Sequence, residues 1–306
     1  MDEINKIIDV IVPCYNVEET IERCIKNLCN QSLSKDRYNC FFINDHSDDR
    51  TGSLLDKYKQ VKNIKIIHHE KNLGLAAARN SGLKVGSSNL VAFLDGDMVV
   101  GRDWLESFLP YLNKGVVAVM GDNIPPGNIS LTPIEKYYFG NLRGARKYKD
   151  GERIPLQYML FGNAILKREV LNKCGFFDES MKKYGGEDID LSSRIWNYYP
   201  KSFVFSKNSD AVHFHRRSFS EFCHSMQTYG KYNLPKLIKK HPHYKNKFAA
   251  DWIFSLKGRL LFNLPLKILV HLIIKIYPLQ ILLRYIVIES TIRGARSSEE
   301  LIDFNS

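Results

Sequence analysis

Several familiar sequence patterns are absent from this chain of 306 residues. It has neither the glycine fingerprint of dinucleotide-binding folds nor the lysine-containing phosphate loop, so a bound phosphate is expected to be held by a metal ion rather than by a glycine-rich turn. Its six cysteines form no CxxC pair and no disulfide-dense spacing. That usage is typical of reduced, mostly structural thiols in a cytosolic chain. Internal repeats and low-complexity tracts are also lacking.

We expect no targeting segment in this sequence. The chain begins Met1-Asp2-Glu3, an acidic start that does not resemble a signal peptide. A transmembrane helix needs about 20 uninterrupted apolar residues. The most apolar stretch, 260–288, is interrupted by proline and by ionisable side chains. We therefore expect a cytoplasmic protein.

The chain does have the composition of an ordinary globular protein, with 44% hydrophobic and 25% charged residues. Its length suffices for one large α/β domain with an appendage, or for two modest domains. The formal net charge of +11 predicts attraction to an anionic partner. Nucleic acid, anionic lipid and a phosphorylated substrate all fit, and charge alone does not choose among them.

Four β-rich runs alternate with helical patterns near the N-terminus, at 7–12, 40–43, 64–67 and 90–94. The first helix is expected to start near Asn16, and an alanine-rich helix is expected around 72–80. This alternation predicts a parallel sheet, in which ligands bind beyond the carboxyl ends of the strands. Unusual polar residues follow three of these strands, at 13–16, 44–45 and 95–97.

The pattern continues less regularly toward the C-terminus. Further strand-like runs lie at 116–120, 159–166, 203–205 and 211–214. Thr132 opens a helix with a capping-box pattern, and another helix opens at Glu187. The basic, aromatic segment 136–153 between them is interpreted as a mobile loop.

Asp95-Gly96-Asp97 follows an unbroken apolar strand. Residues two apart in an extended chain point the same way, so the two aspartates can face one crevice together. Gly96 lets a ligand approach the backbone closely. Two carboxylates at a strand end suit a divalent metal that carries phosphates. The alternative is a plain Asp-Gly turn.

Five short motifs occur in order along the chain: Pro13-Cys14-Tyr15, Asn44-Asp45, Ala78-Arg79-Asn80, Asp95-Gly96-Asp97 and Glu187-Asp188. In this order they resemble the nucleotide-sugar-dependent glycosyltransferases of family 2, and the match covers roughly 5–235. The second motif departs from the family, with Asn44 where an aspartate is frequent and His46 where glycine is frequent. Asp45 keeps the position that reads the base.

The resemblance implies a GT-A fold, an α/β architecture with a mostly parallel central sheet flanked by helices. A catalytic domain is expected at 1–235, with a nucleotide-sugar half at about 1–120 and an acceptor half at 121–235. A basic, amphipathic helical region is expected at 236–306.

The resemblance also implies roles for single residues on the donor side. Pro13 and Tyr15 would line the pocket of the nucleotide base, and Asp45 would accept a hydrogen bond from the imide N–H of uracil. Arg79 would lie near the base or the phosphates. Simple packing of Tyr15 and a surface ion pair of Arg79 are the alternatives.

The implied metal is Mn²⁺ or Mg²⁺. Asp95 would touch the ribose or a metal-bound water, and Asp97 would ligate the metal. The run after 212 resembles the segment that supplies a third metal ligand in several GT-A enzymes. By that match His213 is the ligand, with His215, Arg216 and Arg217 near the diphosphate; His215 remains the alternative ligand.

Glu187 and Asp188 follow two glycines at the start of a helix. The helix dipole alone would favour acids there, and Asp190 is a third. In the family this aspartate deprotonates the acceptor hydroxyl, so Asp188 is interpreted as the base and Glu187 as acceptor-binding. Repulsion between adjacent carboxylates raises the proton affinity of one of them. Aspartate at 188 favours inversion of the sugar.

In the apolar stretch, Lys267, His271 and Lys275 recur every four residues and form one polar stripe on a helix. With nearby basic residues, the region 257–296 is interpreted as helices lying on anionic lipid. Packing on the catalytic domain or on a second copy is the alternative.

The sequence as a whole predicts an inverting, metal-dependent glycosyltransferase of the hexosyl or N-acetylhexosaminyl class. It would move a sugar from a nucleotide-sugar, expected to be a UDP-sugar, to a glycan or lipid-linked acceptor in surface polysaccharide, lipopolysaccharide or glycolipid synthesis. Peripheral attachment to the cytoplasmic face of the membrane goes with this interpretation. The alternatives are a retaining or degenerate nucleotide-sugar binder, a related nucleotidyl- or sugar-phosphate transferase, and a non-catalytic basic protein that binds nucleic acid or membrane. Nucleic acid is not the expected partner, because the basic residues of the C-terminal region alternate with aliphatic ones.

Overall fold

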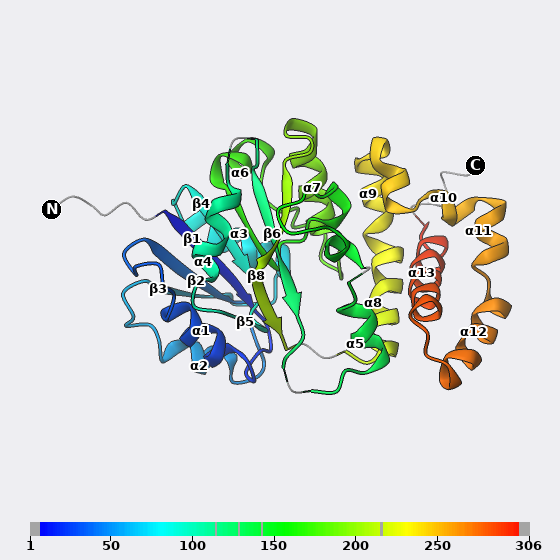
Figure 1. Ribbon diagram of the computed structural model, residues 1–306, viewed down its shortest axis with the longest axis horizontal. Helices are drawn as coiled ribbons and strands as arrows, with labels where there is room; N and C mark the ends of the chain where they lie inside the picture. The colour runs from blue at the N-terminus through cyan, green and yellow to red at the C-terminus, as the bar shows by residue number, and fades with distance from the viewer. Residues whose placement is uncertain (1–6, 114, 128, 142, 215–216, 300–306) are drawn as a thin grey trace.

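The computed structural model describes residues 7–113, 115–127, 129–141, 143–214 and 217–299. The acidic start at 1–3, and also His215 and Arg216, lie outside the described residues. Figure 1 shows a sheet flanked by helices toward the N-terminal end of the molecule, and a stack of helices beside it at the C-terminal end.

One mixed sheet of eight strands forms the centre of the described chain. Its order is β3 (Ile64–His68), β2 (Tyr38–Asn44), β1 (Ile8–Cys14), β4 (Leu90–Leu94), β7 (Asn163–Lys167), β6 (Ala118–Ile124), β8 (Phe203–His213) and β5 (Met98–Val100). The first four strands are parallel, as the alternation predicts. The other half is mixed, because β7 runs antiparallel to β4 and β6, and β5 runs antiparallel to β8.

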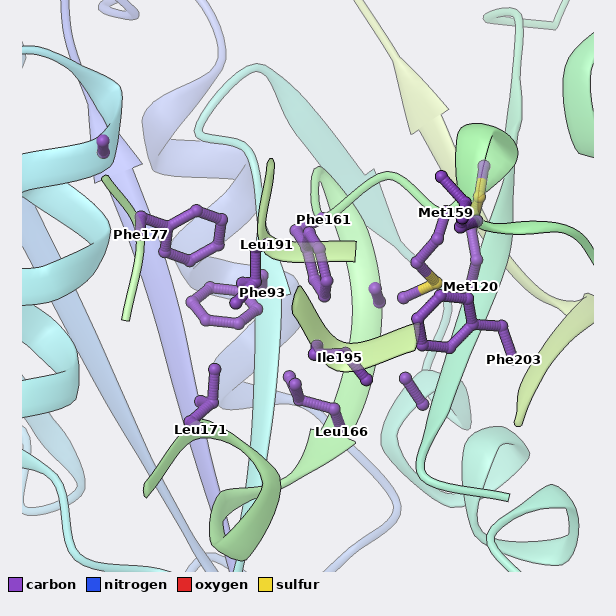
Figure 2. Packing of buried hydrophobic residues seen from close by; sticks show 14 of the residues in the cluster. Phe93, Met120, Met159, Phe161, Leu166, Leu171, Phe177, Leu191, Ile195 and Phe203 are labelled. Atoms are coloured by element: carbon purple, nitrogen blue, oxygen red, sulfur yellow. The ribbon is translucent and has the colours of Figure 1, made fainter. Parts of the chain in front are cut away.

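Apolar helix faces cover both sides of this sheet. On one side lie α1 (Ile21–Cys29), α2 (Thr51–Asp56) and α4 (Trp104–Phe108). On the other side lie α3 (Leu75–Val85), α6 (Arg168–Cys174) and α7 (Glu187–Tyr198). Figure 2 shows the second core, where Phe93, Phe161 and Phe177 meet edge to face with ring centroids 5.4–5.9 Å apart. This aromatic cluster lies directly under the candidate site.

The first helix begins at Ile21 rather than near Asn16. Asn16 has a φ of 52°, a left-handed conformation that does not continue into a helix. The backbone N–H of Val17 donates to Oγ1 of Thr51, and that of Glu18 donates to Oδ2 of Asp49. The loop after β1 is therefore held against the loop after β2, at the edge where the motifs lie.

Two other expectations change in the structure. The strand-like runs 203–205 and 211–214 join into one strand, β8, and its pairing with β6 shifts register near Gly121. A Cβ atom at Gly121 would lie 2.0 Å from the carbonyl oxygen of Ser209, so the two strands approach closely only because glycine stands there. The segment 136–153 contains the end of α5 (Pro133–Tyr138), whose predicted capping box at Thr132 is present, and a short 3₁₀ turn at Gly144–Lys147.

The C-terminal helices form a separate layer in Figure 1. They are α8 (Phe219–Tyr232), α9 (Leu234–Lys240), α10 (Asp251–Phe254), α11 (Leu256–Leu261), α12 (Leu264–Ile276) and α13 (Gln280–Arg296). α13 lies between α8 and α12, and Gly230 and Gly294 let α8 and α13 approach so closely that a Cβ atom on either would meet backbone at about 2 Å. The domain boundary expected at 235 falls within the first turn of α9 and stays a prediction. No helix in the described residues is long and apolar enough to cross a membrane.

Candidate active site

The carboxyl ends of the parallel strands bring the predicted motifs to one edge of the sheet. β1 ends at Cys14, β2 at Asn44 and β4 at Leu94, and each is followed directly by residues of a motif. The chain turns sharply after β4, where the backbone N–H of Met98 donates to the carbonyl of Asp95 over 3.0 Å. This turn sends β5 to pair with the end of β8.

That pairing brings Asp97 next to His213. Met98 is the register partner of His213, and Nε2 of His213 lies 3.1 Å from Oδ2 of Asp97. Burial acts to lower the pKa of His213, but the hydrogen bond and charge of Asp97, together with the charge of Asp95, raise the pKa above its ordinary value. In the described part of the chain, no three His, Cys, Asp or Glu side chains converge as a metal site.

Arg79, on α3, occupies the middle of the site. Its Nη1 lies 2.7 Å from Oδ1 of Asp188, and its Nη2 lies 3.1 Å from Oδ1 of Asp95. The side chain is 1% exposed, so Arg79 does not form the surface ion pair that was the alternative. Its guanidinium lies 5.1 Å from the ring centroid of Phe177. One buried cation thus joins the carboxylate after β4 to a carboxylate at the start of α7.

The segment before Glu187 adopts a backbone conformation that favours glycine. Gly185 and Gly186 have φ values of 74° and 104°, in the left-handed region. Nδ2 of Asn233 donates to the carbonyl of Gly185 over 2.6 Å and fixes the turn from the side of α9. The two glycines therefore shape the entry to α7, and a Cβ atom at Gly186 would lie 3.1 Å from Cβ of Asn233.

Asp190, the third acid at the start of α7, belongs to a buried ion network. Its carboxylate is fully buried and lies within 2.9 Å of nitrogen atoms of Arg194, Lys240 and His241. Burial acts to raise its pKa, but the hydrogen bond from His241 and the charges of Arg194 and Lys240 hold the pKa well below the ordinary value. This network ties α7 to the end of α9.

Glu187 has very different surroundings from Asp190. Its Oε1 lies 3.9 Å from Nη1 of Arg79, beyond hydrogen-bond distance. Burial and the neighbouring charge of Asp188 outweigh Arg79 and raise the pKa of Glu187 to about 7. Asp188 instead bonds to Arg79, and its Oδ2 accepts the backbone N–H of Phe161 over 3.2 Å. The raised proton affinity expected for one of the two carboxylates thus falls on Glu187.

A cavity of about 500 Å³ collects much of the predicted site. Its lining includes the ionisable side chains of Asp95, Asp97, Glu187, Asp188, His213 and Arg79. The aromatic wall is the group of aromatic side chains in the same lining, from α5 and its end, α8 and the loop before α7: Tyr138, Phe139, Tyr184, Phe222 and Tyr229. The ring centroids of Tyr138 and His213 lie 6.0 Å apart. Sequence reasoning missed this aromatic wall. Tyr138 lies in the basic, aromatic segment that the sequence marked, but nothing in the pattern pointed to α8.

Pro13, Tyr15 and Asp45 do not line this cavity. Pro13 is buried in β1, and Tyr15 is 47% exposed just beyond the strand end. The carboxylate of Asp45 bonds to the imidazole of His69 and accepts the backbone N–H groups of Leu73 and Gly74, all within 2.8 Å. Asp45 therefore holds the loop before α3 while lying at the same edge of the sheet.

The family model and curated relatives both point to glycosyltransferases. A family model described as Glycosyl transferase family 2 matches residues 9–175. Glycosyltransferase GlyA of Streptococcus pneumoniae is 26% identical over 226 residues, which covers 70% of this chain and 31% of that protein. The uncharacterized glycosyltransferase EpsJ of Bacillus subtilis is 40% identical over 116 residues, 38% of this chain and 33% of that protein. The chain spans about a third of the length of the curated relatives it matches.

Solved structures show the same fold. The mannosyltransferase PcManGT from Pyrobaculum calidifontis, in complex with GDP-Man and Mn²⁺, has a TM-score of 0.66 at 17% identity and covers 95% of this chain and 86% of that chain. Residues 1–349 of TarS from S. aureus, in complex with UDP, have a TM-score of 0.57 at 18% identity and cover 98% of this chain and 92% of that chain. The expected GT-A fold, including C-terminal helices, is confirmed by these likenesses.

Proposed function

We propose, on the premise that this chain belongs to glycosyl transferase family 2, that it transfers a sugar from a nucleotide-sugar to an acceptor hydroxyl, with inversion and with a divalent metal. One observation carries this proposal. Asp95, Asp97, Glu187 and Asp188, which are far apart in the sequence, line a single cavity beyond the carboxyl ends of the strands. Such an edge is where open α/β sheets bind ligands.

The nucleotide is proposed to lie at Pro13, Tyr15 and Asp45. The exposed ring of Tyr15 offers an aromatic face to a base. A carboxylate has about four lone-pair sites, and protein groups at Asp45 use two on Oδ1 and one on Oδ2. One site on Oδ2 is left for the imide N–H of uracil. TarS was solved with UDP and PcManGT with GDP-Man, so the choice of UDP rests on Tyr15, Asp45 and the family resemblance.

Asp97 and His213 fit a divalent metal. Two ligands held at right angles about 2.1 Å from Mg²⁺ or a similar cation lie about 3.0 Å apart. The observed separation of Nε2 of His213 and Oδ2 of Asp97 is 3.1 Å, and the same pair forms a hydrogen bond without the ion. Such cations usually take few protein ligands and complete their shell with phosphate oxygens and water. When bound, Mn²⁺ or Mg²⁺ would act as a Lewis acid toward the departing diphosphate.

Asp188 is proposed as the base. It would take the proton of the acceptor hydroxyl while that oxygen attacks the anomeric carbon and the bond to the diphosphate breaks on the opposite face. Its contact with Arg79, 2.7 Å long, holds the carboxylate in position. Glu187, with a pKa of about 7, carries a proton in part of the molecules near neutral pH and can donate a hydrogen bond to the acceptor. Asp95 holds the other side of Arg79, and the aromatic wall would stack on the acceptor.

The acceptor is proposed to be a glycan or a lipid-linked glycan, with the protein attached to the cytoplasmic face of an anionic membrane. The outer face of α11 and α12 is apolar and exposed: Leu256, Leu260, Leu264, Ile268, Leu269, Leu272, Ile273 and Ile276. Between residues 252 and 288 the sequence has no acidic residue, whereas Lys257, Arg259 and Arg284 are basic and exposed. An apolar face with a basic rim complements anionic lipid.

A thermal-shift panel tests the donor site. UDP, GDP, CMP and TDP are compared, each with Mn²⁺ and with EDTA, because a ligand at a hundredfold excess over Kd adds about 2.7 kcal/mol of apparent stability. A shift with UDP that requires Mn²⁺ is the expected result. No shift with any nucleotide would refute the nucleotide-sugar proposal and favour a non-catalytic binding protein.

A further inference from the structure

A second cavity of about 530 Å³ lies beside the first, at the junction of α5, the start of α8, the end of α12 and the start of α13. Ile134, Glu135 and Arg217 line both cavities, so they are neighbours with a common wall. In Figure 1 these four helix ends meet on the side of the molecule where β8 ends. The carboxylates of Asp95, Asp97, Glu187 and Asp188 line the first cavity and not the second.

The polar stripe of α12 lies at this junction: Lys267 faces α13, whereas His271 and Lys275 line the second cavity and stay exposed. Nζ of Lys267 lies 2.8 Å from Oε2 of Glu289 on α13. The ring of His271 stacks on Phe219 of α8 at 6.4 Å, and His271 and Lys275 line the second cavity. α12 therefore turns Lys267 toward the protein and leaves much of its apolar side exposed, whereas a water-facing helix usually turns its polar side outward.

The charges of the second cavity favour an anion. Arg217 and Lys275 contribute positive charge and His271 adds a hydrogen-bond donor, against one carboxylate, that of Glu135. The carboxylate of Glu135 already caps α5, where it accepts the N–H and hydroxyl of Thr132 over 2.8 Å each. Phosphate is the anion that such a set of donors binds well.

Apart from Thr132 and Ser218, the rest of the lining is apolar, from Pro133, Ile134, Phe219, Ile274, Pro278 and Leu283. Ile273 and Ile276 of α12, which flank the lining residues Ile274 and Lys275, belong to the exposed apolar face. A ligand that fills this cavity can therefore place an anionic group against Lys275 and continue with an alkyl chain along α12.

We propose that the second cavity binds the phosphate of a lipid-carried acceptor. The alkyl chain leaves along the apolar face of α12, and the acceptor sugar reaches the catalytic cavity past the common wall. This proposal rests on the proposed transferase function, because it assigns the acceptor of that site. The chemistry required of the ligand is a phosphate ester that carries a long alkyl or prenyl group.

The test measures binding of farnesyl phosphate by calorimetry, below its micelle concentration, to the full chain. Farnesol lacks the phosphate and inorganic phosphate lacks the chain, and both are expected to bind at least about tenfold more weakly. Lys275→Gln is expected to weaken the binding of farnesyl phosphate about tenfold and to leave the binding of farnesol unchanged. Lys257→Gln is the matched control, an exposed lysine beside the same apolar face that does not line the cavity.

Cosedimentation with phosphatidylglycerol vesicles separates the cavity from the surface. Lys257→Gln and Lys275→Gln should weaken vesicle binding to a similar, small extent. Only Lys275→Gln should weaken the binding of farnesyl phosphate. Equal effects of the two variants on farnesyl phosphate would overturn the proposal. Binding of farnesol as tightly as farnesyl phosphate would also overturn the proposal. Binding of inorganic phosphate as tightly as farnesyl phosphate would overturn it too, because the cavity would then be a site for free anions.

The shift with UDP and Mn²⁺ is recorded in the same preparations. If the Lys275→Gln variant keeps this thermal shift and binds farnesyl phosphate more weakly, the result supports the acceptor site. A chain that binds farnesyl phosphate as expected but shows no nucleotide shift would refute the transferase proposal and leave the phosphate site in place. The two failures are therefore distinguishable.

Discussion

Replacing Glu187 by glutamine is expected to stabilise the protein above neutral pH. An ordinary glutamate has a pKa of 4.5, and burial beside Asp188 raises that of Glu187 to about 7. Between these pH values the folded chain holds a proton that the unfolded chain releases, so the free energy of unfolding falls as pH rises. The pKa difference of about 2.5 units corresponds to a loss of about 3 kcal/mol in the free energy of unfolding. This loss is complete above pH 7. Glutamine has nearly the same shape and no charge, so Glu187→Gln removes this penalty.

Asp190→Asn is the matched control with the opposite sign. The folded-state pKa of Asp190 is depressed, so its contribution to stability is present above the unfolded-state value and is lost as pH falls through the folded-state value. At neutral pH the asparagine would leave Arg194 and His241 facing a neutral amide inside the protein. Breaking a buried ion pair from one side costs about 3–5 kcal/mol, so this variant should be strongly destabilised.

Urea unfolding of the three chains at pH 5 and pH 8 measures both effects. The stability gained by Glu187→Gln should grow by about 2 kcal/mol from pH 5 to pH 8, because the native-state proton is lost over that interval. Parallel curves with unchanged slopes are required for this interpretation. A pH-independent difference, or a Glu187→Gln chain less stable than wild type at pH 8, would refute the reasoning. Agreement would mean that Glu187 is maintained at a cost in stability, as functional groups often are.

Three further changes test other parts of the proposal. Asp97→Asn should lower metal-dependent turnover at least about a hundredfold; wild-type initial rates across a Mn²⁺ titration would remove Asp97 from the metal site. Asp188→Asn should keep the thermal shift with UDP and Mn²⁺ and lose about a thousandfold in transfer, within the range of general-base effects; lost nucleotide binding would indicate a structural role instead. Leu272→Asp, on the exposed face of α12, should weaken cosedimentation with anionic vesicles more than about tenfold, since a buried leucine contributes about 1.5–3 kcal/mol; unchanged cosedimentation would contradict membrane attachment.

The parts of the fold that could be predicted are those governed by local pattern. The four strands of the parallel half are all present, and the capping box at Thr132 forms, because periodicity and capping depend on residues a few positions apart. The predicted start of α1 was wrong by several residues. The backbone N–H groups expected in its first turn instead donate hydrogen bonds to Thr51 and Asp49, after β2. Such contacts, between residues more than thirty positions apart, leave no periodic signal.

The same distinction applies to α12. Its polar stripe was recognised from the spacing of Lys267 and Lys275, but spacing alone does not say which way a helix face turns. The structure turns Lys267 toward α13, where Glu289 is a buried partner, and places His271 and Lys275 at the second cavity, where both stay exposed. The apolar face is left outside as a consequence. This is the opposite of what amphipathic periodicity predicts for a helix packed on a water-soluble core.

The sequence by itself determined the family, the order of the motifs and which strand ends carry them, because each motif is a short run whose chemistry is local. Only the tertiary structure decided which ionisable groups of those motifs form ion pairs and which have a shifted pKa. Arg79 joins Asp95 to Asp188, Glu187 keeps a raised pKa, and Asp190, two residues after Asp188, becomes part of a buried network with α9. Burial and the distance between charges set these properties. Both depend on segments that are brought together by the sheet and lie far apart along the chain.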